Sequence, residues 1–449
     1  MKKILTLIVL LFGLVLVTGC LPSQDDPPNL DDFDAKINID TNTQANLRIL
    51  IPGGNLNETT MIESAIEGFN LIYPNINISL SYVSVNAYEN TVRNQAAAGV
   101  LPDIIWTNTP DILFLIDKNL ALPLNQYFEL SEEADVFNLE ETFHKEFIDM
   151  VTVNGNIYAI PRSADSVVTF YNKKLLSEAG VDLTRIQNGW TWETFLDIAR
   201  EMRTYYDANG MNERYIIDAN LTTWLSVNYP MLRSFGADVA DAEGNIILDS
   251  PETIATLEAV RTLVTERLSV ATGMTAGSSF EVGTSPFLFQ SAAISLFAER
   301  RELKNNIDIV SFPLIGDSPK IGSGVAGYSI NANTQYKDES WAFLNYLLSF
   351  EGQERMAEGG LKLPSIRKDL ADFTTAEWGK GYENLNLGAY LYGPQYKLSI
   401  EFLNYFDPKY KPDLDLAIRD LFNNASNPDR TIRDALDIAL RDIDDALSN

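Results

Sequence analysis

The hydrophobic pattern of the first folded stretch alternates between strand and helix spacing. A compact apolar run at 47–51 and an alternating apolar–polar run at 76–82 are both predicted to be strands. Between them, apolar residues recur every three or four positions and predict a helix that ends before Pro74. A second helix over 87–98 and a short buried strand over 101–106 follow. This order predicts a mainly parallel sheet with helices on both faces.

The rest of the chain continues the alternation. Thr191 is in position to cap a helix whose apolar face includes Trp192 and Phe195. An amphipathic pattern over 432–447 predicts a long helix near the C-terminus. The remaining predicted elements are strands at 157–160, 167–171, 292–297 and 307–312 and a helix around 341–348.

The N-terminal residues have the pattern of a signal peptide. Two lysines precede an apolar run at 4–17, and small residues lead to Cys20. The run is shorter than the ~20 apolar residues that a membrane-spanning helix needs. Residues 17–20 (VTGC) resemble the lipobox of bacterial lipoproteins, in which the cysteine is acylated and the chain is cut just before it. We therefore expect a signal peptide at 1–19 and a lipid on Cys20, which would hold the protein on the outer face of the cell membrane.

Composition adds a tether and an acidic surface. Residues 20–45 comprise Cys20 and a stretch rich in Pro, Asp, Asn and Thr, which predicts a disordered tether. Cys20 is the single cysteine, so intramolecular disulfides and Cys-rich zinc sites are excluded. The net charge is −28, and loss of the two lysines with the signal peptide makes it −30. Such a surface excludes nucleic acid as a partner and repels anionic lipid headgroups, so membrane contact is expected through the lipid anchor alone.

Four segments stand in a recognisable order. They are GVLPDIIW at 99–106, NGNIYAIP at 154–161, FYNK at 170–173 with AGVD at 179–182 and WTWETF at 190–195, and 341–360 followed by LP at 363–364. Together they resemble the bacterial extracellular solute-binding proteins of the sugar-binding class, which serve ABC importers. Trp190 and Trp192 are assigned to packing, because a Thr-Trp pair supplies a helix cap and a large aromatic anchor.

The resemblance implies an α/β fold with two lobes, of the type II periplasmic-binding-protein kind, with a hinge and a ligand cleft between the lobes. Applied to this chain, it gives a first lobe of 46–164 plus 325–365 and a second lobe of 165–324 plus 366–449. Crossings between the lobes are expected near 162–168, 326–330 and 363–367.

A sugar site needs flat aromatic faces for the ring and polar groups for the hydroxyls. Because open α/β sheets bind ligands at the carboxyl ends of their strands, the loops after the predicted strands are candidates. In the second lobe, the resemblance places ring-stacking aromatics at Trp224 and Tyr229. For each candidate the alternative is a core or turn role. The expected ligand-binding residues are Gly54, Asn55, Trp106, Asn108, Asp165, Trp224, Tyr229, Arg300, Gly327 and Tyr328.

Arg300 marks a departure from the family pattern. After a strand like 292–297, the proteins that this chain resembles commonly carry Gly and then a Trp that stacks on the sugar. Here the sequence is AERR at 298–301. Either Arg300 contacts the ligand, which favours an acidic or highly oxygenated solute, or another aromatic residue such as Trp224 supplies the platform.

Motifs for catalysis and cofactors are weak. GSGVAG at 322–327 fits GxGxxG but lacks the preceding strand and following helix of a dinucleotide site. His144, the single histidine, is expected in a solvated helix and has no nucleophile-elbow pattern beside it. Asp207 and Asn209 begin like a calcium loop, but Asn212 stands where that loop requires Gly, so a structural calcium stays open. We expect no catalytic residue, no metal and no cofactor.

The leading hypothesis is therefore a monomeric, non-enzymatic binding protein. It would capture a sugar by lobe closure and deliver it to the permease subunits of an ABC importer. Two alternatives stay open. One is a secreted carbohydrate-active enzyme, since the spacing of carboxylates in space is unknown. The other is a sensor or adhesin lipoprotein with the same fold.

Overall fold

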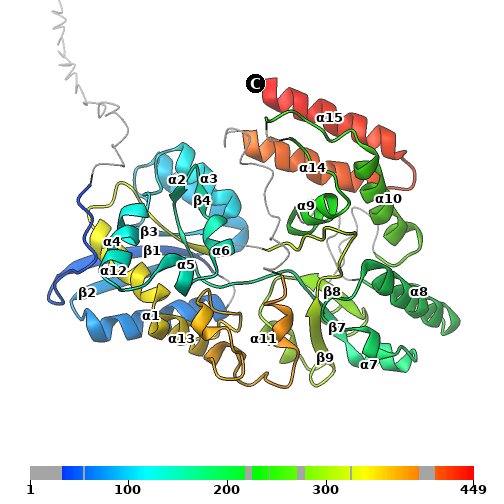
Figure 1. The fold of residues 1–449 in the computed structure, drawn as a ribbon, viewed down its shortest axis with the longest axis horizontal. Helices are drawn as coiled ribbons and strands as arrows, with labels where there is room; N and C mark the ends of the chain where they lie inside the picture. The colour runs from blue at the N-terminus through cyan, green and yellow to red at the C-terminus, as the bar shows by residue number, and fades with distance from the viewer. Residues whose placement is uncertain are drawn as a thin grey trace, which may run out of the picture.

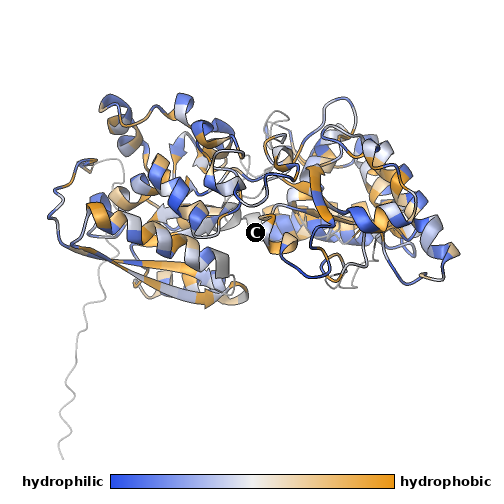
Figure 2. Cartoon of the chain, turned by 90° about the horizontal axis from the view of Figure 1, so that it is seen from below, coloured by the Kyte–Doolittle hydropathy of each residue, from blue (hydrophilic) through white to orange (hydrophobic). Residues whose placement is uncertain are grey.

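The computed structural model describes residues 33–53, 56–217, 225–241, 243–269, 279–323, 326–393 and 410–448. This part of the chain forms two bodies joined by a few crossing segments (Figures 1 and 2). Each body has its own sheet, and we call them the first lobe and the second lobe. Among the described helices, none combines the length and the apolar content that a membrane crossing requires.

The first lobe is built on a five-stranded sheet with the order β2-β1-β3-β10-β6. β1 runs parallel to β2 and β3, whereas β10 is antiparallel to both β3 and β6. The predicted parallel strands near the N-terminus are confirmed, and the late strand β10 makes the sheet mixed. The strands are β1 (Ala45–Gly53), β2 (Ile76–Ser84), β3 (Ile104–Asn108), β6 (Ile160–Pro161) and β10 (Ala326–Ile330), with a separate hairpin of β4 (Thr152–Val153) and β5 (Asn156–Ile157).

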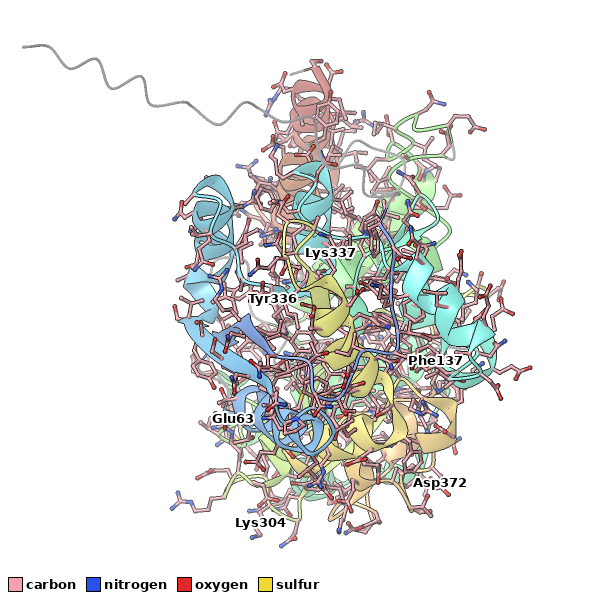
Figure 3. The ribbon with its side chains drawn as sticks, turned by 90° about the vertical axis from the view of Figure 1, so that its left-hand side faces the viewer. Glu63, Phe137, Lys304, Tyr336, Lys337 and Asp372 are labelled. Atoms are coloured by element: carbon pink, nitrogen blue, oxygen red, sulfur yellow. The ribbon has the colours of Figure 1, made fainter. Side chains whose placement is uncertain are left out.

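Helices cover both faces of this sheet, which explains the continuous apolar run from Ile49 to Ile51 in β1. Ile49 belongs to the large core cluster that includes α1, whereas Leu50 belongs to a smaller cluster with Tyr88 of α2. Neighbouring strand residues point to opposite faces, so both faces are buried. Figure 3 views the first lobe from the left-hand side of Figure 1, with α1, which carries Glu63, and α12, which begins at Lys337, toward the reader. The helices are α1 (Leu56–Ile72), α2 (Val85–Ala97), α3 (Thr109–Asp117), α4 (Asn125–Glu133), α5 (Leu139–Thr142), α6 (Lys145–Asp149), α12 (Lys337–Leu348) and α13 (Phe350–Glu358).

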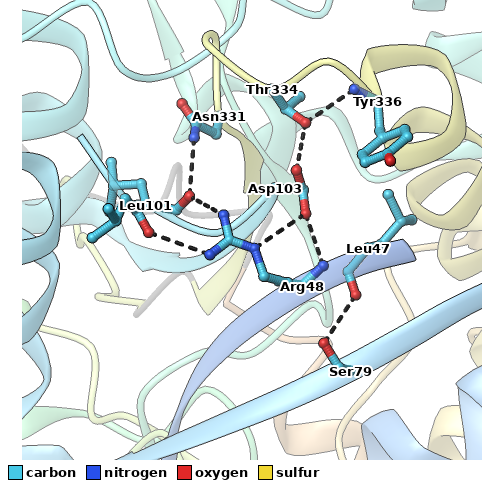
Figure 4. Close-up of polar contacts among 9 residues, drawn as sticks. Leu47, Arg48, Ser79, Leu101, Asp103, Asn331, Thr334 and Tyr336 are labelled. Atoms are coloured by element: carbon cyan, nitrogen blue, oxygen red, sulfur yellow. Dashed lines mark hydrogen bonds and ion pairs between the residues drawn. The ribbon is translucent and has the colours of Figure 1, made fainter. Parts of the chain in front are cut away.

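Asp103, the acid of the Leu-Pro-Asp segment before β3, joins three parts of the first lobe (Figure 4). Its carboxylate accepts a 2.8 Å hydrogen bond from the backbone amide of Arg48 in β1 and a 2.5 Å bond from the hydroxyl of Thr334 after β10. The Arg48 guanidinium in turn donates to the carbonyl of Leu101 at 2.8 Å. Asp103 is buried, so these bonds offset the cost of burying its charge and fix the entry of β3.

The second lobe is built on a three-stranded antiparallel sheet with the order β8-β7-β9. The predicted Thr191 cap is confirmed, because its hydroxyl accepts a hydrogen bond from the amide of Thr194 at the start of α8. Trp190 and Trp192 are each 4% exposed, which confirms their packing role. The elements are β7 (Val168–Asn172), β8 (Phe287–Gln290), β9 (Ile307–Ser311), α7 (Lys173–Glu178), α8 (Trp192–Ala208), α9 (Leu225–Ser234), α10 (Pro251–Thr265), α11 (Ser295–Ala298), α14 (Lys411–Ser426) and α15 (Ile432–Ser448), with short 3-10 turns η1 (Leu183–Arg185), η2 (Lys368–Leu370), η3 (Glu377–Gly379) and η4 (Leu387–Ala389).

The predicted strand at 292–297 is wrong. β8, at Phe287–Gln290, occupies the position beside β7, and the chain then turns into the short helix α11. Within this segment Ile294 and Phe297 are both buried, and their spacing of three is that of a helix face. A short apolar run is compatible with a strand as well as with a helix, so the local sequence could not decide between them.

Part of the segment predicted as a tether, residues 20–45, packs against the first lobe. Phe33, Ala35, Ile37 and Ile39 pack against the first lobe, and the ring of Phe33 lies 5.5 Å from that of Tyr127. These four residues alternate with polar ones, so one side of an extended segment is apolar enough to dock. The signal peptide and Cys20 lie outside the described residues.

Candidate functional site

The first passage between the sheets is residues 162–167, which run between β6 and β7. Neighbouring segments hold it on several sides through backbone hydrogen bonds. The amide of Arg162 donates to Ala326 at 3.0 Å, that of Ala164 to Pro364 at 2.8 Å, and that of Val167 to Gly322 at 2.8 Å. The first passage therefore lies against the segments that were expected to form the other two.

The other passages fall at slightly different places than the expected ones. The chain returns from β9 to β10 between Ser311 and Ala326, so 326–330 is itself a strand of the first sheet. After Leu363, η2 still contacts α5 and η3 contacts α13, whereas η4 contacts β9. The last passage therefore follows η3.

β3 and β10 bring four candidate residues to one edge of the first sheet. Tyr328 pairs with Trp106 across the two strands, and Ala326 pairs with Asn108. Because β10 is antiparallel, its first residues lie beside the carboxyl end of β3, where open α/β sheets bind ligands. Gly327 sits between β3 and β6, and a Cβ placed there would lie 2.0 Å from the carbonyl oxygen of Ile160. Only glycine fits at this position.

Trp106 is half-buried and is held by Tyr88 of α2. The two rings meet edge to face, with centroids 5.4 Å apart and planes at 84°. The Tyr88 hydroxyl lies 2.6 Å from the carbonyl oxygen of Trp106 and 3.2 Å from that of Leu50, so it bridges β3 and β1. Asn108, two residues further on, is also half-buried. Tyr88 thus fixes the position of the Trp106 ring near the end of β3.

Three charged side chains meet beside these residues, and we call Glu58, Arg162 and Asp165 the crossing cluster. Glu58, in the first turn of α1, forms an ion pair of 3.2 Å with Arg162, and their side chains are 8% and 15% exposed. Asp165, on the same passage as Arg162, is 7% exposed. The cluster contains two carboxylates and one guanidinium in a buried place.

Burial sets the protonation behaviour of the cluster. It raises the pKa of Asp165 to about 7, against the lowering effects of Arg162 and of a hydrogen bond from Ser163, and with a further increase from Glu58. Burial by itself lowers the pKa of Arg162, but Glu58, Asp165 and Tyr328 together outweigh it and raise that pKa. Burial, and then Glu58, raise the pKa of the Tyr328 hydroxyl, which stays neutral.

Several buried polar atoms here make no hydrogen bond to any residue that the structure describes. They combine donors and acceptors within a short stretch of the fold, and buried polar groups are normally paired. A polyhydroxylated ligand offers both kinds of partner at once. These atoms are Oε1 of Glu58, Nε1 of Trp106, Nε of Arg162 and the hydroxyl oxygen of Tyr328.

The second-lobe candidates lie in other surroundings. Tyr229 is 1% exposed in α9, where burial and then Asp415 of α14 raise the pKa of its hydroxyl. Arg300 is exposed after α11 and pairs with Glu281 at 2.8 Å. The Arg300 charge therefore already has a counter-ion, and Tyr229 is part of the core beside α14.

Sequence reasoning placed part of this site and missed another part. Trp106, Asn108, Asp165, Gly327 and Tyr328 come together, whereas Gly54, Asn55 and Trp224 lie outside the described residues. It missed Glu58, Arg162 and Ser163 as polar groups of the site. A signal for Arg162 existed, because a charged residue follows an apolar strand at a predicted crossing. Glu58 looked like an ordinary acid in the first turn of a helix.

The other motifs acquire structural explanations. The GxGxxG stretch leads into strand β10 rather than a helix, as expected. His144 precedes α6 and is half-buried, not solvated inside a helix, and burial lowers its pKa. The carboxylate of Asp207 pairs with Arg203 at 2.7 Å and with Arg267 at 2.6 Å. Across the described residues, no three His, Cys, Asp or Glu side chains gather as a metal site would require.

Comparison with known proteins defines the class to which this fold and site belong. The sequence pattern of the bacterial extracellular solute-binding proteins matches residues 53–354, which is more than half of the chain. The protein belongs to this family.

Solved structures agree on the fold. An ABC substrate-binding protein from Listeria monocytogenes in complex with cycloalternan superposes with a TM-score of 0.74 at 18% identity, over 90% of this chain and all of that one. An ABC transporter solute-binding protein from Thermotoga lettingae bound with α-D-tagatose gives a TM-score of 0.70 at 16% identity, over 90% of this chain and all of that one. The predicted two-lobe α/β type II fold is confirmed.

Curated relatives match shorter segments. The arabinooligosaccharide-binding protein of Halalkalibacterium halodurans is 23% identical over 45% of this chain and 43% of its own length. The maltotriose-binding protein of Pyrococcus abyssi is 26% identical over 44% of this chain and 38% of its own length. The match thus spans less than half of each of these two relatives.

Proposed function

We propose that this protein captures a neutral carbohydrate at the carboxyl edge of the first sheet and acts by binding without turnover. The observation that carries the proposal is the pairing of a fixed, half-buried aromatic face at Trp106 with the unpaired polar atoms beside it. An aromatic face suits the C–H side of a sugar ring, and mixed donors and acceptors suit its hydroxyls. Family membership and the sugars named with the relatives support the same reading.

Charge favours a neutral solute over a sugar acid. The crossing cluster has two carboxylates for one guanidinium, so it repels a further carboxylate. Arg300, the residue that would favour an acidic solute, is paired with Glu281. A buried site of this kind accepts hydroxyl groups, which donate hydrogen bonds to carboxylates without adding charge.

The first experiment is a thermal-shift screen of the mature protein against maltotriose, lactose, arabinotriose, D-tagatose and glucuronic acid. A neutral sugar at 100 times its dissociation constant should stabilise the fold by about 2.7 kcal/mol, a rise of a few degrees in Tm. Trp106→Ala should weaken binding roughly tenfold or more by removing the ring platform. Phe350→Ala, an exposed aromatic on α13, is the matched control and should bind normally.

Several outcomes would count against the proposal. A shift with glucuronic acid alone would contradict the neutral-solute assignment, and silence across the panel would contradict sugar capture. Equal affinities for Trp106→Ala and Phe350→Ala would remove Trp106 from the site. Chromatography of the bound sugar after long incubation should return it unchanged, and its hydrolysis would indicate an enzyme instead.

We also propose that a lipid on Cys20 anchors the protein outside the cell membrane, where it delivers the sugar to the permease subunits of an ABC importer. The motif at 17–20 and the family support this location. Cys20→Ala should release the protein into the medium and abolish uptake of the labelled sugar, although the released protein still binds it. Retention of the variant on membranes, or undiminished uptake, would contradict the anchor or the delivery role.

A further inference from the structure

Asp165 lies in the most enclosed part of the first passage between the lobes. Besides the three backbone hydrogen bonds of this passage, the Ser323 hydroxyl donates to the carbonyl oxygen of Asp165, and the Ser166 hydroxyl donates to the carbonyl oxygen of Tyr390 at 2.9 Å. The segment is therefore packed between the approach to β10 and the segment that follows η4. The carboxyl group of Asp165 has little contact with water.

The groups around this carboxyl leave one acid in excess. Arg162 is the guanidinium of the crossing cluster and already pairs with Glu58 of α1 at 3.2 Å. β10 contributes Tyr328, and the segment after η4 contributes Tyr390, whose hydroxyl donates to the carbonyl oxygen of Ala292 at 2.5 Å. Both tyrosines are neutral, so they supply no compensating charge. With both acids ionised, the buried cluster carries a net charge of −1.

We propose that capture of the sugar releases a proton from the crossing cluster, with Asp165 as the group that titrates. The inference rests on the proposed function, because it needs a neutral sugar bound beside Trp106 and Tyr328. In the free protein near neutral pH, Asp165 is a mixture of its neutral and ionised forms, because burial raises its pKa to about 7.

The direction follows from two competing effects of the ligand. A sugar hydroxyl that donates a hydrogen bond to the carboxylate stabilises the ionised form and lowers its pKa. Lobe closure would remove water and favour the neutral form, but Asp165 is already only 7% exposed, so little further burial remains. The hydrogen bond therefore dominates, and the proton leaves the carboxyl group for the buffer.

The sign of the pH dependence follows directly. Ligand binding lowers the pKa of Asp165 below its free value of about 7, so the ionised form binds more tightly. Affinity should rise as pH increases from about 5.5 and level off above about 8. A lowering of the pKa by about one unit corresponds to roughly five- to tenfold tighter binding at pH 8.5 than at pH 5.5.

Isothermal titration calorimetry tests this with maltotriose, or with whichever neutral sugar of the screen binds. Titrations at pH 7.0 in phosphate and in Tris, which differ in ionisation enthalpy, count the protons exchanged. Because the sugar has no titratable group, any proton comes from the protein. We expect the release of roughly 0.3–0.5 proton per sugar, and dissociation constants at pH 5.5, 7.0 and 8.5 that fall with pH.

Two variants test whether Asp165 is the group that releases the proton. Asp165→Asn keeps the shape of the side chain but cannot ionise, so both the buffer dependence and the pH dependence should vanish. Asp372→Asn, a change at a surface acid that pairs with Thr374, is the control and should keep both. Release that persists in Asp165→Asn would overturn the assignment and point to another group, such as His144.

The wild-type titrations decide the inference even if Asp165→Asn does not fold. Binding with no exchanged proton and equal affinity at the three pH values would overturn the inference and leave sugar capture standing. Proton uptake on binding would overturn it as well. Absence of binding at every pH would overturn the proposed function, and the inference with it.

Discussion

At the scale of single residues, Gly327 shows how closely the strands of the first sheet approach at the site. Its backbone is paired with Thr107 on one side and with Pro161 on the other. A methyl group there would meet the carbonyl oxygen of Ile160 at 2.0 Å, and a backbone atom in a sheet cannot move aside cheaply. The same approach brings Tyr328 beside Trp106. The sequence predicted a ligand-binding role for this glycine, and the structure gives it a packing role between strands.

Gly327→Ala should therefore lower the free energy of unfolding by roughly 3 kcal/mol, since an overpacked position forces backbone shifts. Gly388→Ala is the matched control, because the nearest atom to its added methyl would be 3.8 Å away. That variant should stay within about 0.5 kcal/mol of the wild type. Urea denaturation followed by circular dichroism measures both, and equal midpoints for the two variants would contradict the close approach.

At the scale of elements, periodicity over ten or more residues predicted a helix securely, whereas one of the short apolar runs was assigned to the wrong structure. The helix predicted over 432–447 is α15, with Ala435, Leu436 and Ile443 buried on one face. Buried residues recur every three or four positions along the whole helix, and a pattern of this length identifies an amphipathic helix. At 292–297 the apolar run is six residues long, and only the pairing of β8 with β7 decided that it lies beyond the strand. Partner strands are chosen in three dimensions, so local sequence could not supply this.

At the scale of the whole molecule, the two lobes and the passages between them are the features that bear on mechanism. We propose lobes close to the predicted limits, 46–164 plus 325–365 and 165–324 plus 366–449. The contacts of η2 and η3 with the first lobe favour extending its last segment to about residue 380. Closure of the lobes over the sugar would follow if the ligand binds the closed arrangement more tightly than the open one.

Small-angle X-ray scattering checks this closure. With a saturating neutral sugar, the radius of gyration should fall by roughly a few per cent of the ~22 Å expected for a compact chain of this length. A sugar that produces no thermal shift should leave the scattering curve unchanged. An unchanged radius with a bound sugar would contradict closure, although the binding itself would stand.

The sequence by itself determined the order of the first five elements, from β1 to β3, the packing role of Trp190 and Trp192, and the family. Each of these depends on local spacing or on motifs read along the chain. Only the tertiary structure decided that β10 lies between β3 and β6, that Glu58 pairs with Arg162, and that Arg300 already has a partner. Glu58 and Arg162 are more than 100 residues apart, and the burial that shifts the pKa of Asp165 arises only when distant segments pack around it.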